Sequence, residues 1–376
     1  MAFLLYAYGG FALVVATVGR WRRRGVRSAP ITPRVSVIVA AYNEAAVIAE
    51  RLDNALALDY PRDLLQIIIA ADGCSDETEA IVRGYADRGV QLLSLPRLGK
   101  IGALNAAVEQ ADGEILVFSD ANTMCEPQAL RALLRNFADR DVGGVAGHTS
   151  YALEATTESS GRGERLYWRY DTWLKRLESD TGSVVSAHGG LYAIRRALYQ
   201  RVPDGAVTDD FAISTAVIEQ GYRLVFEPGA RAVEFAVPEA SREFRRRVRL
   251  MTRGLRSVLL RKRLLDPRRY GFYAVVLFSH KVARRLAPVA LVAVAVSSTW
   301  LASQSPFFRV LAFGQAAFYG AALIGWMLRR ARLGGSKVLY IPLYYCMANA
   351  ASALALLDVA RGKRIAMWKP QRQPAR

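Results

Sequence analysis

The chain has 376 residues, of which 52% are hydrophobic, with a formal net charge of +18 and a mean hydropathy of +0.11. A positive balance of this size fits nucleic acid, an anionic membrane surface or an anionic substrate. No recognised nucleic-acid-binding motif accompanies the arginines, which argues against nucleic acid as a partner. The three cysteines, Cys74, Cys125 and Cys346, have no paired spacing, which excludes a disulfide framework and a zinc site.

The chain opens with an apolar segment. Residues 2–18 carry no charge and reach the short limit for a membrane span. A signal peptide is the alternative, but no basic residue precedes the apolar run and the sequence GRWRRR follows it. We therefore predict a transmembrane helix over residues 1–19 with its N-terminus outside, then a basic linker over 20–34 that leads into the cytoplasm.

Short β-branched runs then alternate with helix-periodic segments. The predicted strands are VSVIVAAYNE (35–44), LLQIIIAAD (64–72), VQLLSL (90–95) and EILVFSD (114–120). This alternation predicts an α/β fold with a doubly wound sheet, in which ligands bind beyond the carboxyl ends of the strands. Polar side chains follow the strands at such ends, namely Asn43–Glu44, Asp72 and Asp120. We expect these side chains to share one edge of the sheet.

Two further segments precede the C-terminal region. Residues 151–178 are amphipathic and predict a helix. The sequence VTDDFAISTAVIEQGYRLVF predicts a helix followed by a strand, and Asp209 and Asp210 open that helix. Capping of the helix is the alternative explanation for both acids.

Apolar segments return near the C-terminus. Residues 257–287 mix an apolar face with cations and suit an interfacial helix. About three transmembrane helices are expected over 288–357, at Pro288–Ala302, Phe307–Leu328 and Val338–Leu357. Counting crossings places the basic tail, 358–376, outside, against the positive-inside tendency. Either the last segment does not fully cross, or the tendency is overridden.

Five motifs occur in an order that resembles the family-2 glycosyltransferases of GT-A fold. They are VSVIVAAYNE, AADGCSDET, GKIGALNAA, SDANTM and TDDF. The resemblance covers about residues 35–256 and is strongest to membrane-embedded synthases of chitin oligosaccharide, poly-N-acetylglucosamine, hyaluronan and cellulose. It implies a Rossmann-like nucleotide-diphospho-sugar transferase domain flanked by transmembrane helices. Five positions depart from the family pattern: Ala41 replaces a proline, Ala71 replaces an acid, Asn122 stands in the metal-binding motif, and Arg246 and Leu250 replace a glutamine and a tryptophan.

The resemblance also implies roles for single residues. Asp210 corresponds to the general base, and Asp120 with Asn122 corresponds to the site of Mg²⁺ or Mn²⁺. Asp209 and the segment His188, Gly189 and Gly190 correspond to the acceptor side. The donor contacts implied by the resemblance are Ala41, Asn43, Glu44, Asp72, Lys100, Asp120, Arg246, Arg247 and Arg249. For the three arginines, a basic helix facing the membrane is an equally good explanation.

One carboxylate is enough for the metal, because Mg²⁺ keeps several waters and takes one or two carboxylates plus substrate phosphates. The resemblance thus predicts an inverting transferase of the cell membrane, multi-pass and with its domain in the cytoplasm. It would use a UDP-sugar and a glycan or lipid-linked acceptor, with membrane lipids and polysaccharide-export proteins as further partners. The alternatives are a processive β-polysaccharide synthase and a catalytically weakened nucleotide-sugar-binding protein.

Overall fold

The computed structural model describes residues 1–376 except 153–157, 204–207, 236–239, 329–335 and 364–376. The chain divides into two compact units. The sheet unit consists of Val15–Pro238 and Pro267–Tyr273 in the described part of the chain. The helical unit consists of Met1–Val14, Glu239–Asp266 and the described part of Ala274–Ile365.

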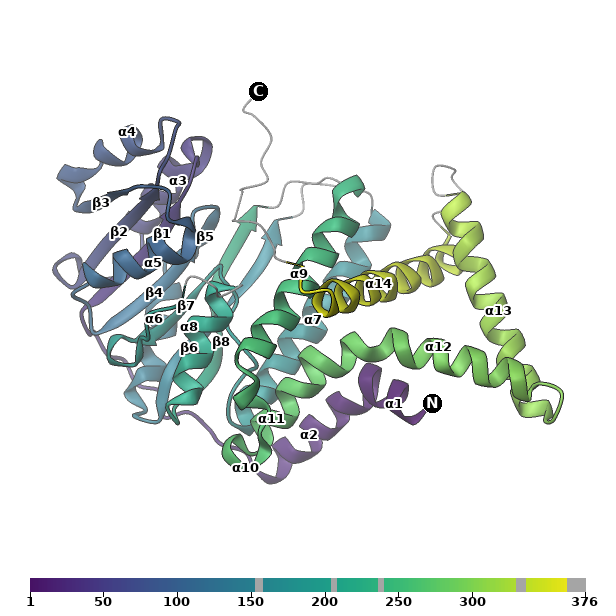
Figure 1. Cartoon of the computed structure of the whole chain (residues 1–376). Coiled ribbons are helices and arrows are strands. Elements are labelled where there is room, and N and C mark those ends of the chain that lie inside the picture. The colour runs from purple at the N-terminus through teal and green to yellow at the C-terminus, as the bar shows by residue number, and fades with distance from the viewer. Residues whose placement is uncertain (153–157, 204–207, 236–239, 329–335, 364–376) are drawn as a thin grey trace. The chain divides into compact units, whose positions relative to one another are not determined.

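Within the described residues, the sheet unit contains one eight-stranded sheet with the order β3-β2-β1-β4-β7-β6-β8-β5 (Figure 1). Its strands are β1 (Val35–Ala41), β2 (Leu65–Asp72), β3 (Val90–Leu95), β4 (Ile115–Asp120), β5 (Thr123–Cys125), β6 (Val142–Ala152), β7 (Tyr192–Arg195) and β8 (Arg223–Phe235). The first four strands in this order are parallel, whereas β7 is antiparallel to both of its neighbours. The sheet is therefore mixed, and its parallel half forms the predicted α/β core.

Helices cover both faces of this sheet. They are α3 (Ala45–Leu56), α4 (Thr78–Arg83), α5 (Gly99–Glu109), α6 (Ala129–Leu134), α7 (Glu158–Thr181) and α8 (Asp209–Glu219). Alternate residues of β1 (Val35, Val37, Val39) share a core with Ile48 of α3 and Leu130 of α6. β1 is buried along its whole length, as its run of apolar residues predicts for a strand covered on both faces.

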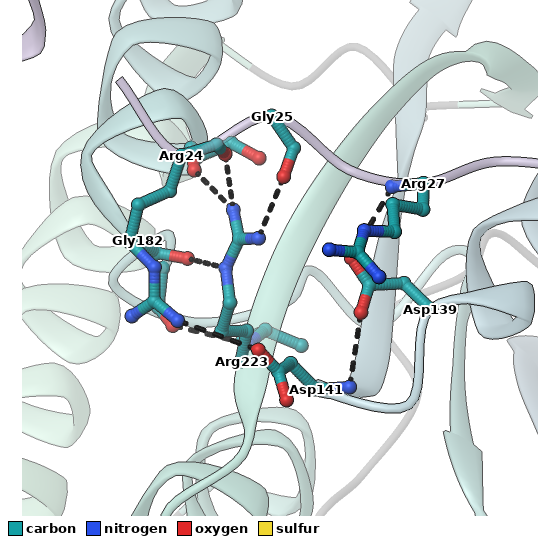
Figure 2. A network of polar contacts seen from close by, with 10 residues as sticks. Arg24, Gly25, Arg27, Asp139, Asp141, Gly182 and Arg223 are labelled. Atoms are coloured by element: carbon teal, nitrogen blue, oxygen red, sulfur yellow. Dashed lines mark hydrogen bonds and ion pairs between the residues drawn. The ribbon is translucent and has the colours of Figure 1, made fainter. Parts of the chain in front are cut away.

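The segment after the first apolar helix is bonded to the sheet unit, although we expected a linker there (Figure 2). Arg223 is buried, and its guanidinium donates to the carbonyl oxygens of Arg24 (2.7 Å), Gly25 (3.0 Å) and Gly182 (2.9 Å). The backbone N–H of Arg27 donates to Asp139 Oδ2 at 3.2 Å. Because a buried guanidinium must satisfy its donors, these carbonyls hold the segment in place.

The helical unit contains α1 (Ala2–Leu5), the first part of α2 (Phe11–Trp21), the arginine-rich α9 (Ala240–Leu260), the last part of α11 (Phe272–Leu277), α12 (Arg284–Leu301), α13 (Pro306–Met327) and α14 (Lys337–Ala360). The Tyr8 hydroxyl donates to Asn349 Oδ1 at 2.7 Å, and Tyr6 is hydrogen-bonded to Ser279. In the described part of the chain, four helices are long and apolar enough to cross a membrane: Ala2–Trp21, Phe272–Leu301, Pro306–Met327 and Lys337–Ala360. This indicates membrane association.

The structure differs from expectation in three places. Tyr151 and Ala152 were expected in a helix but end β6, where they pair with β8. The first C-terminal apolar helix begins at Phe272, so part of the segment predicted to be interfacial belongs to one 30-residue helix. Glu239–Asp266 groups with the helical unit, although the transferase domain is expected over residues 35–256. Most of the predicted basic tail, 364–376, lies outside the described residues.

Candidate functional site

The carboxyl ends of the parallel strands bring Asp72 and Asp120 to the same edge of the sheet. In the register, Ala41 of β1 lies beside Ala71 of β2, and Ala40 lies beside Asp120 of β4. The two acids therefore flank the end of β1, as expected for strands that run in parallel.

Lys100 connects Asp120 to the start of α8. Its Nζ lies 2.7 Å from Asp120 Oδ1 and 2.8 Å from Asp209 Oδ2. Burial by itself would lower the pKa of Lys100, but the two carboxylates more than offset burial and raise that pKa. Burial conversely raises the pKa of Asp120, yet Lys100 outweighs it and the pKa of Asp120 is lowered. Lys100 and Asp120 are therefore both charged at neutral pH.

Asp209 and Asp210 occupy the first turn of α8, where the helix dipole favours negative charge. Asp210 Oδ1 accepts a hydrogen bond from the Phe211 N–H at 2.7 Å. The capping explanation thus accounts for part of the geometry. It does not account for the contact of Asp209 with Lys100, which comes from a different element.

Tyr192 is a residue that sequence reasoning missed. It is 1% exposed on β7, and its ring stacks on Phe118 at 5.0 Å. Burial raises the pKa of Tyr192 well above its usual value, and the carboxylates of Asp209, Asp210 and Asp120 add to this effect. The phenol is therefore neutral. Its hydroxyl has no hydrogen-bond partner in the part of the chain that the structure describes. No local pattern marks it, since it reads as an ordinary strand tyrosine.

The predicted acceptor segment lies against Asp120. A side-chain carbon at Gly189 would lie 3.2 Å from Asp120 Oδ2 and would crowd that oxygen. The Ser119 hydroxyl donates to the Gly190 carbonyl at 2.8 Å and ties the segment to β4. Burial lowers the pKa of His188, against the opposing effect of nearby carboxylates, so its ring is neutral at neutral pH.

Asp72 is fully buried and bonded to protein groups. Its Oδ1 accepts hydrogen bonds from the backbone N–H groups of Leu98 (2.6 Å) and Gly99 (2.9 Å), and its Oδ2 pairs with Arg97. The Arg97 guanidinium also stacks over the Tyr42 ring at 3.4 Å. Asp72 thus fixes the start of α5, which carries Lys100. The donor contact implied for Asp72 stays a prediction.

The remaining residues implied on the donor side lie at the end of β1 or just after it. Ala41 and Glu44 are buried, and the Glu44 N–H donates to Thr78 Oγ1 at 2.8 Å. Asn43 adopts a left-handed conformation with φ 53°, and its Oδ1 accepts from the Ser75 N–H at 2.8 Å. These bonds join the loops that follow β1 and β2.

The three arginines implied as diphosphate contacts belong to α9 of the helical unit. The Arg247 guanidinium lies over the Tyr344 ring at 4.7 Å, and Leu250 is 53% exposed. The side chain of Arg246 lies outside the described residues. Contacts of Arg246, Arg247 and Arg249 with a diphosphate stay predictions.

A second feature that sequence reasoning missed supports the segment that follows Asp120. Asn54 of α3 accepts from the Cys125 N–H at 2.8 Å and donates to the Cys125 carbonyl at 2.9 Å. Arg51 is fully buried and donates to Asn54 Oδ1 at 3.4 Å, while its Nε and Nη2 have no partner among the described residues. Burial lowers the pKa of Arg51, and Cys125 and Asp120 oppose this effect. The sequence does not predict these bonds, because Asn54 and Cys125 lie far apart in the chain and meet only in the folded structure.

The residues around Asp120 fit a divalent cation bound together with a diphosphate. Among the described residues, no group of three or more histidine, cysteine or acidic side chains could hold a metal by itself. Asp120 supplies one carboxylate beside an open glycine, and the amide of Asn122 lies near Glu234, with Nδ2 3.4 Å from Oε1. A cavity of about 790 Å³ lies elsewhere, at the amino end of β4, and none of the site carboxylates lines it.

Comparison with known proteins identifies the sheet unit. Residues 36–202 match the model of Glycosyl transferase family 2. The chain is 27% identical over 279 residues to the probable glycosyltransferase YdaM of Bacillus subtilis, covering 65% of this chain and 63% of that protein. It is 28% identical over 236 residues to a poly-beta-1,6-N-acetyl-D-glucosamine synthase of Staphylococcus aureus, covering 60% of this chain and 56% of that protein. The chain thus spans less than two thirds of the length of these relatives.

Among solved structures, the mannosyltransferase PcManGT from Pyrobaculum calidifontis, in complex with GDP-Man and Mn²⁺, is similar with a TM-score of 0.70 and 25% identity. The alignment covers 96% of this chain and 98% of that chain. The family match, the mixed sheet and this structural similarity confirm the predicted resemblance and fold. Residues 36–202 therefore resemble a family-2 glycosyltransferase domain, and the sheet unit has the GT-A fold.

Proposed function

We propose that the chain is a membrane-bound inverting glycosyltransferase, which transfers a sugar from a nucleoside-diphosphate sugar to a glycan or lipid-linked acceptor. The observation that carries this proposal is the Lys100 bridge between Asp120 and Asp209, at 2.7 Å and 2.8 Å. It joins the implied metal ligand at the end of β4 to the acid pair at the start of α8. A transferase needs both acids at one point, because the leaving diphosphate and the attacking hydroxyl meet at one sugar carbon.

The proposed chemistry assigns each side chain a task. Asp210 accepts the proton of the acceptor hydroxyl as that oxygen attacks the anomeric carbon. Lys100 binds and orients the diphosphate, and Gly189 leaves room beside Asp120. When bound by Asp120 and Asn122, the divalent cation supplies positive charge that offsets charge developing on the leaving diphosphate. Direct displacement inverts the anomeric centre.

A donor screen tests both the nucleobase and the sugar of the donor. The resemblance implies a UDP-sugar, whereas PcManGT was solved with GDP-Man. We would measure nucleoside-diphosphate release by the detergent-solubilised full chain with UDP-glucose, UDP-N-acetylglucosamine and GDP-mannose, with Mn²⁺ or Mg²⁺ and a broad acceptor mixture. Release with one donor, lost in Asp210→Asn while the melting temperature is kept, supports the proposal. Nucleoside-diphosphate release by Asp210→Asn at the wild-type rate would refute the role of Asp210 as the general base.

Two alternatives are separated by related measurements. A processive synthase, suggested by the synthase among the relatives, would convert a labelled donor into long products, whereas a single-transfer enzyme adds one sugar. A weakened nucleotide-sugar-binding protein, suggested by Ala71, Asn122 and Leu250, would bind donor without turnover in every arm.

We further propose that the sheet unit faces the cytoplasm and that the apolar helices cross the membrane several times. Arg22 is exposed directly after α2 and is a suitable labelling position. An Arg22→Cys variant that lacks the native cysteines should react with a membrane-impermeant thiol reagent in inside-out vesicles only. Reaction in right-side-out vesicles would contradict the orientation.

A further inference from the structure

The position of Lys100 is fixed from outside the acid cluster. Lys100 follows Gly99, which has φ 81°, in the first turn of α5. The Gly99 N–H donates to the buried carboxylate of Asp72, so that turn is held by β2. The Lys100 side chain is only 18% exposed. Its ammonium therefore has a defined place between Asp120 and Asp209, rather than the freedom of a surface lysine.

We propose that Lys100 is the resident counter-cation of the site and keeps the divalent cation out until a diphosphate arrives. This inference rests on the proposed function, because it takes Asp120 as the metal ligand. In the structure, the ammonium already holds the Oδ1 of Asp120 and the Oδ2 of Asp209. A divalent cation takes oxygen ligands at about 2.0–2.6 Å, so it and the ammonium cannot both hold Oδ1 of Asp120.

The charges lead to the same conclusion. One ammonium, that of Lys100, is shared between two carboxyl groups, Asp120 and Asp209. A divalent cation alone would add two positive charges beside a fixed ammonium. A diphosphate sugar carries two negative charges, so cation and diphosphate together leave the net charge of the site unchanged. The site is therefore built to take both ligands and to bind the bare metal weakly.

The diphosphate also gives Lys100 a new partner. A lysine ammonium binds phosphate oxygens well, and the long flexible stem lets Nζ leave Asp120 while α5 stays in place. Asp120 Oδ1 then becomes free for the metal. Because binding free energies are reciprocal, the metal must strengthen nucleotide binding by the same factor by which the nucleotide strengthens metal binding.

The test measures Mn²⁺ binding alone, by the loss of the free Mn²⁺ spectroscopic signal on titrating the detergent-solubilised full chain. Lys100→Met removes the charge but keeps the length of the side chain, and Lys100→Arg is the matched control that keeps the charge. We expect Lys100→Met to bind Mn²⁺ about tenfold more tightly than the wild type, because a nearby positive charge is removed. Lys100→Arg should bind as weakly as the wild type. General damage to the fold would not tighten metal binding.

A Lys100→Met variant that binds Mn²⁺ no more tightly than the wild type, with an unchanged melting temperature, overturns the proposal. Adding Asp120→Asn to Lys100→Met should abolish the gain; a gain that persists would place the metal elsewhere and also overturn it. If Lys100→Met does not fold, nucleotide binding by the wild type tests the proposal instead. The affinity of the wild type for UDP or GDP should rise about tenfold with saturating Mn²⁺. An affinity that is the same with and without Mn²⁺ would refute the coupling between metal binding and nucleotide binding.

The proposed transferase function can be refuted independently of the proposed role of Lys100. A chain that binds neither UDP nor GDP, with or without Mn²⁺, would remove the transferase proposal. The comparison of Mn²⁺ alone between the wild type and Lys100→Met would still decide the role of Lys100.

Discussion

Replacing Asp72 by asparagine separates a structural role of this acid from a role in nucleotide contact. The buried carboxylate receives the N–H groups of Leu98 and Gly99 and the guanidinium of Arg97. An asparagine amide keeps one acceptor oxygen but turns an NH₂ group or a neutral oxygen towards Arg97. Hydrogen bonds to charged groups contribute about 1.5–3 kcal/mol each, and the helix N-terminus adds about 0.3–1 kcal/mol. We therefore expect Asp72→Asn to lose about 3 kcal/mol of stability.

The assay is thermal unfolding of the full chain in detergent, without nucleotide, followed by intrinsic fluorescence. For a domain of this size, about 1 kcal/mol corresponds to about 2–4 °C, so the melting temperature should fall by about 10 °C. The matched control is Asp59→Asn. Asp59 pairs with Arg131 at 2.9 Å, but both side chains are about half exposed, so the change should stay within about 2 °C. An Asp72→Asn variant that melts like the wild type and loses only nucleotide affinity would refute the structural assignment.

Further predictions concern the same site. Gly189→Ala places a carbon 3.2 Å from Asp120 Oδ2, so it should weaken Mn²⁺-dependent nucleotide binding with little change in melting temperature. Gly190→Ala places a carbon 2.7 Å from the Thr149 side chain, so it should lower the free energy of unfolding by about 1–3 kcal/mol. Equal melting temperatures for the two variants would contradict this contrast. Tyr192→Phe removes a buried hydroxyl without a partner among the described residues, so the free energy of unfolding should rise by about 1 kcal/mol, and a clear loss would mean that the hydroxyl is bonded. Chelation of divalent cations should stop nucleoside-diphosphate release, and Mn²⁺ or Mg²⁺ should restore it; release that continues in chelator would exclude the proposed metal role.

Local pattern was sufficient for the parallel half of the sheet. The run EILVFSD predicted β4, which spans Ile115–Asp120, and the run VSVIVAAYNE predicted β1, which spans Val35–Ala41. A strand buried on both faces needs a continuous apolar stretch, and such a stretch is visible in one short window. The apolar helices were visible for the same reason, because hydropathy is a sum over neighbouring residues.

Local pattern failed where partners are distant in the chain. Tyr151 and Ala152 are strand residues because β8 pairs with them, and the pairing partners, Glu234 and Phe235, lie far along the sequence. The helix from Phe272 to Leu301 continues through a charged stretch because its backbone hydrogen bonds do not depend on side-chain polarity. A change in composition therefore does not mark the start of a helix.

The sequence by itself determined which residue types are present, their order in five motifs, and the strand ends that follow the apolar runs. The resemblance to family-2 glycosyltransferases could therefore be named in advance, whereas the roles of Asp120 and Asp210 stay predictions. Only the tertiary structure decided that Lys100 lies between Asp120 and Asp209 and that Asp72 holds the start of α5. The physical reason is the distance along the chain over which each interaction acts. Strand and helix propensities act over a few neighbouring residues, whereas an ion pair or a buried hydrogen bond depends on the distance between two atoms that the folded backbone brings together.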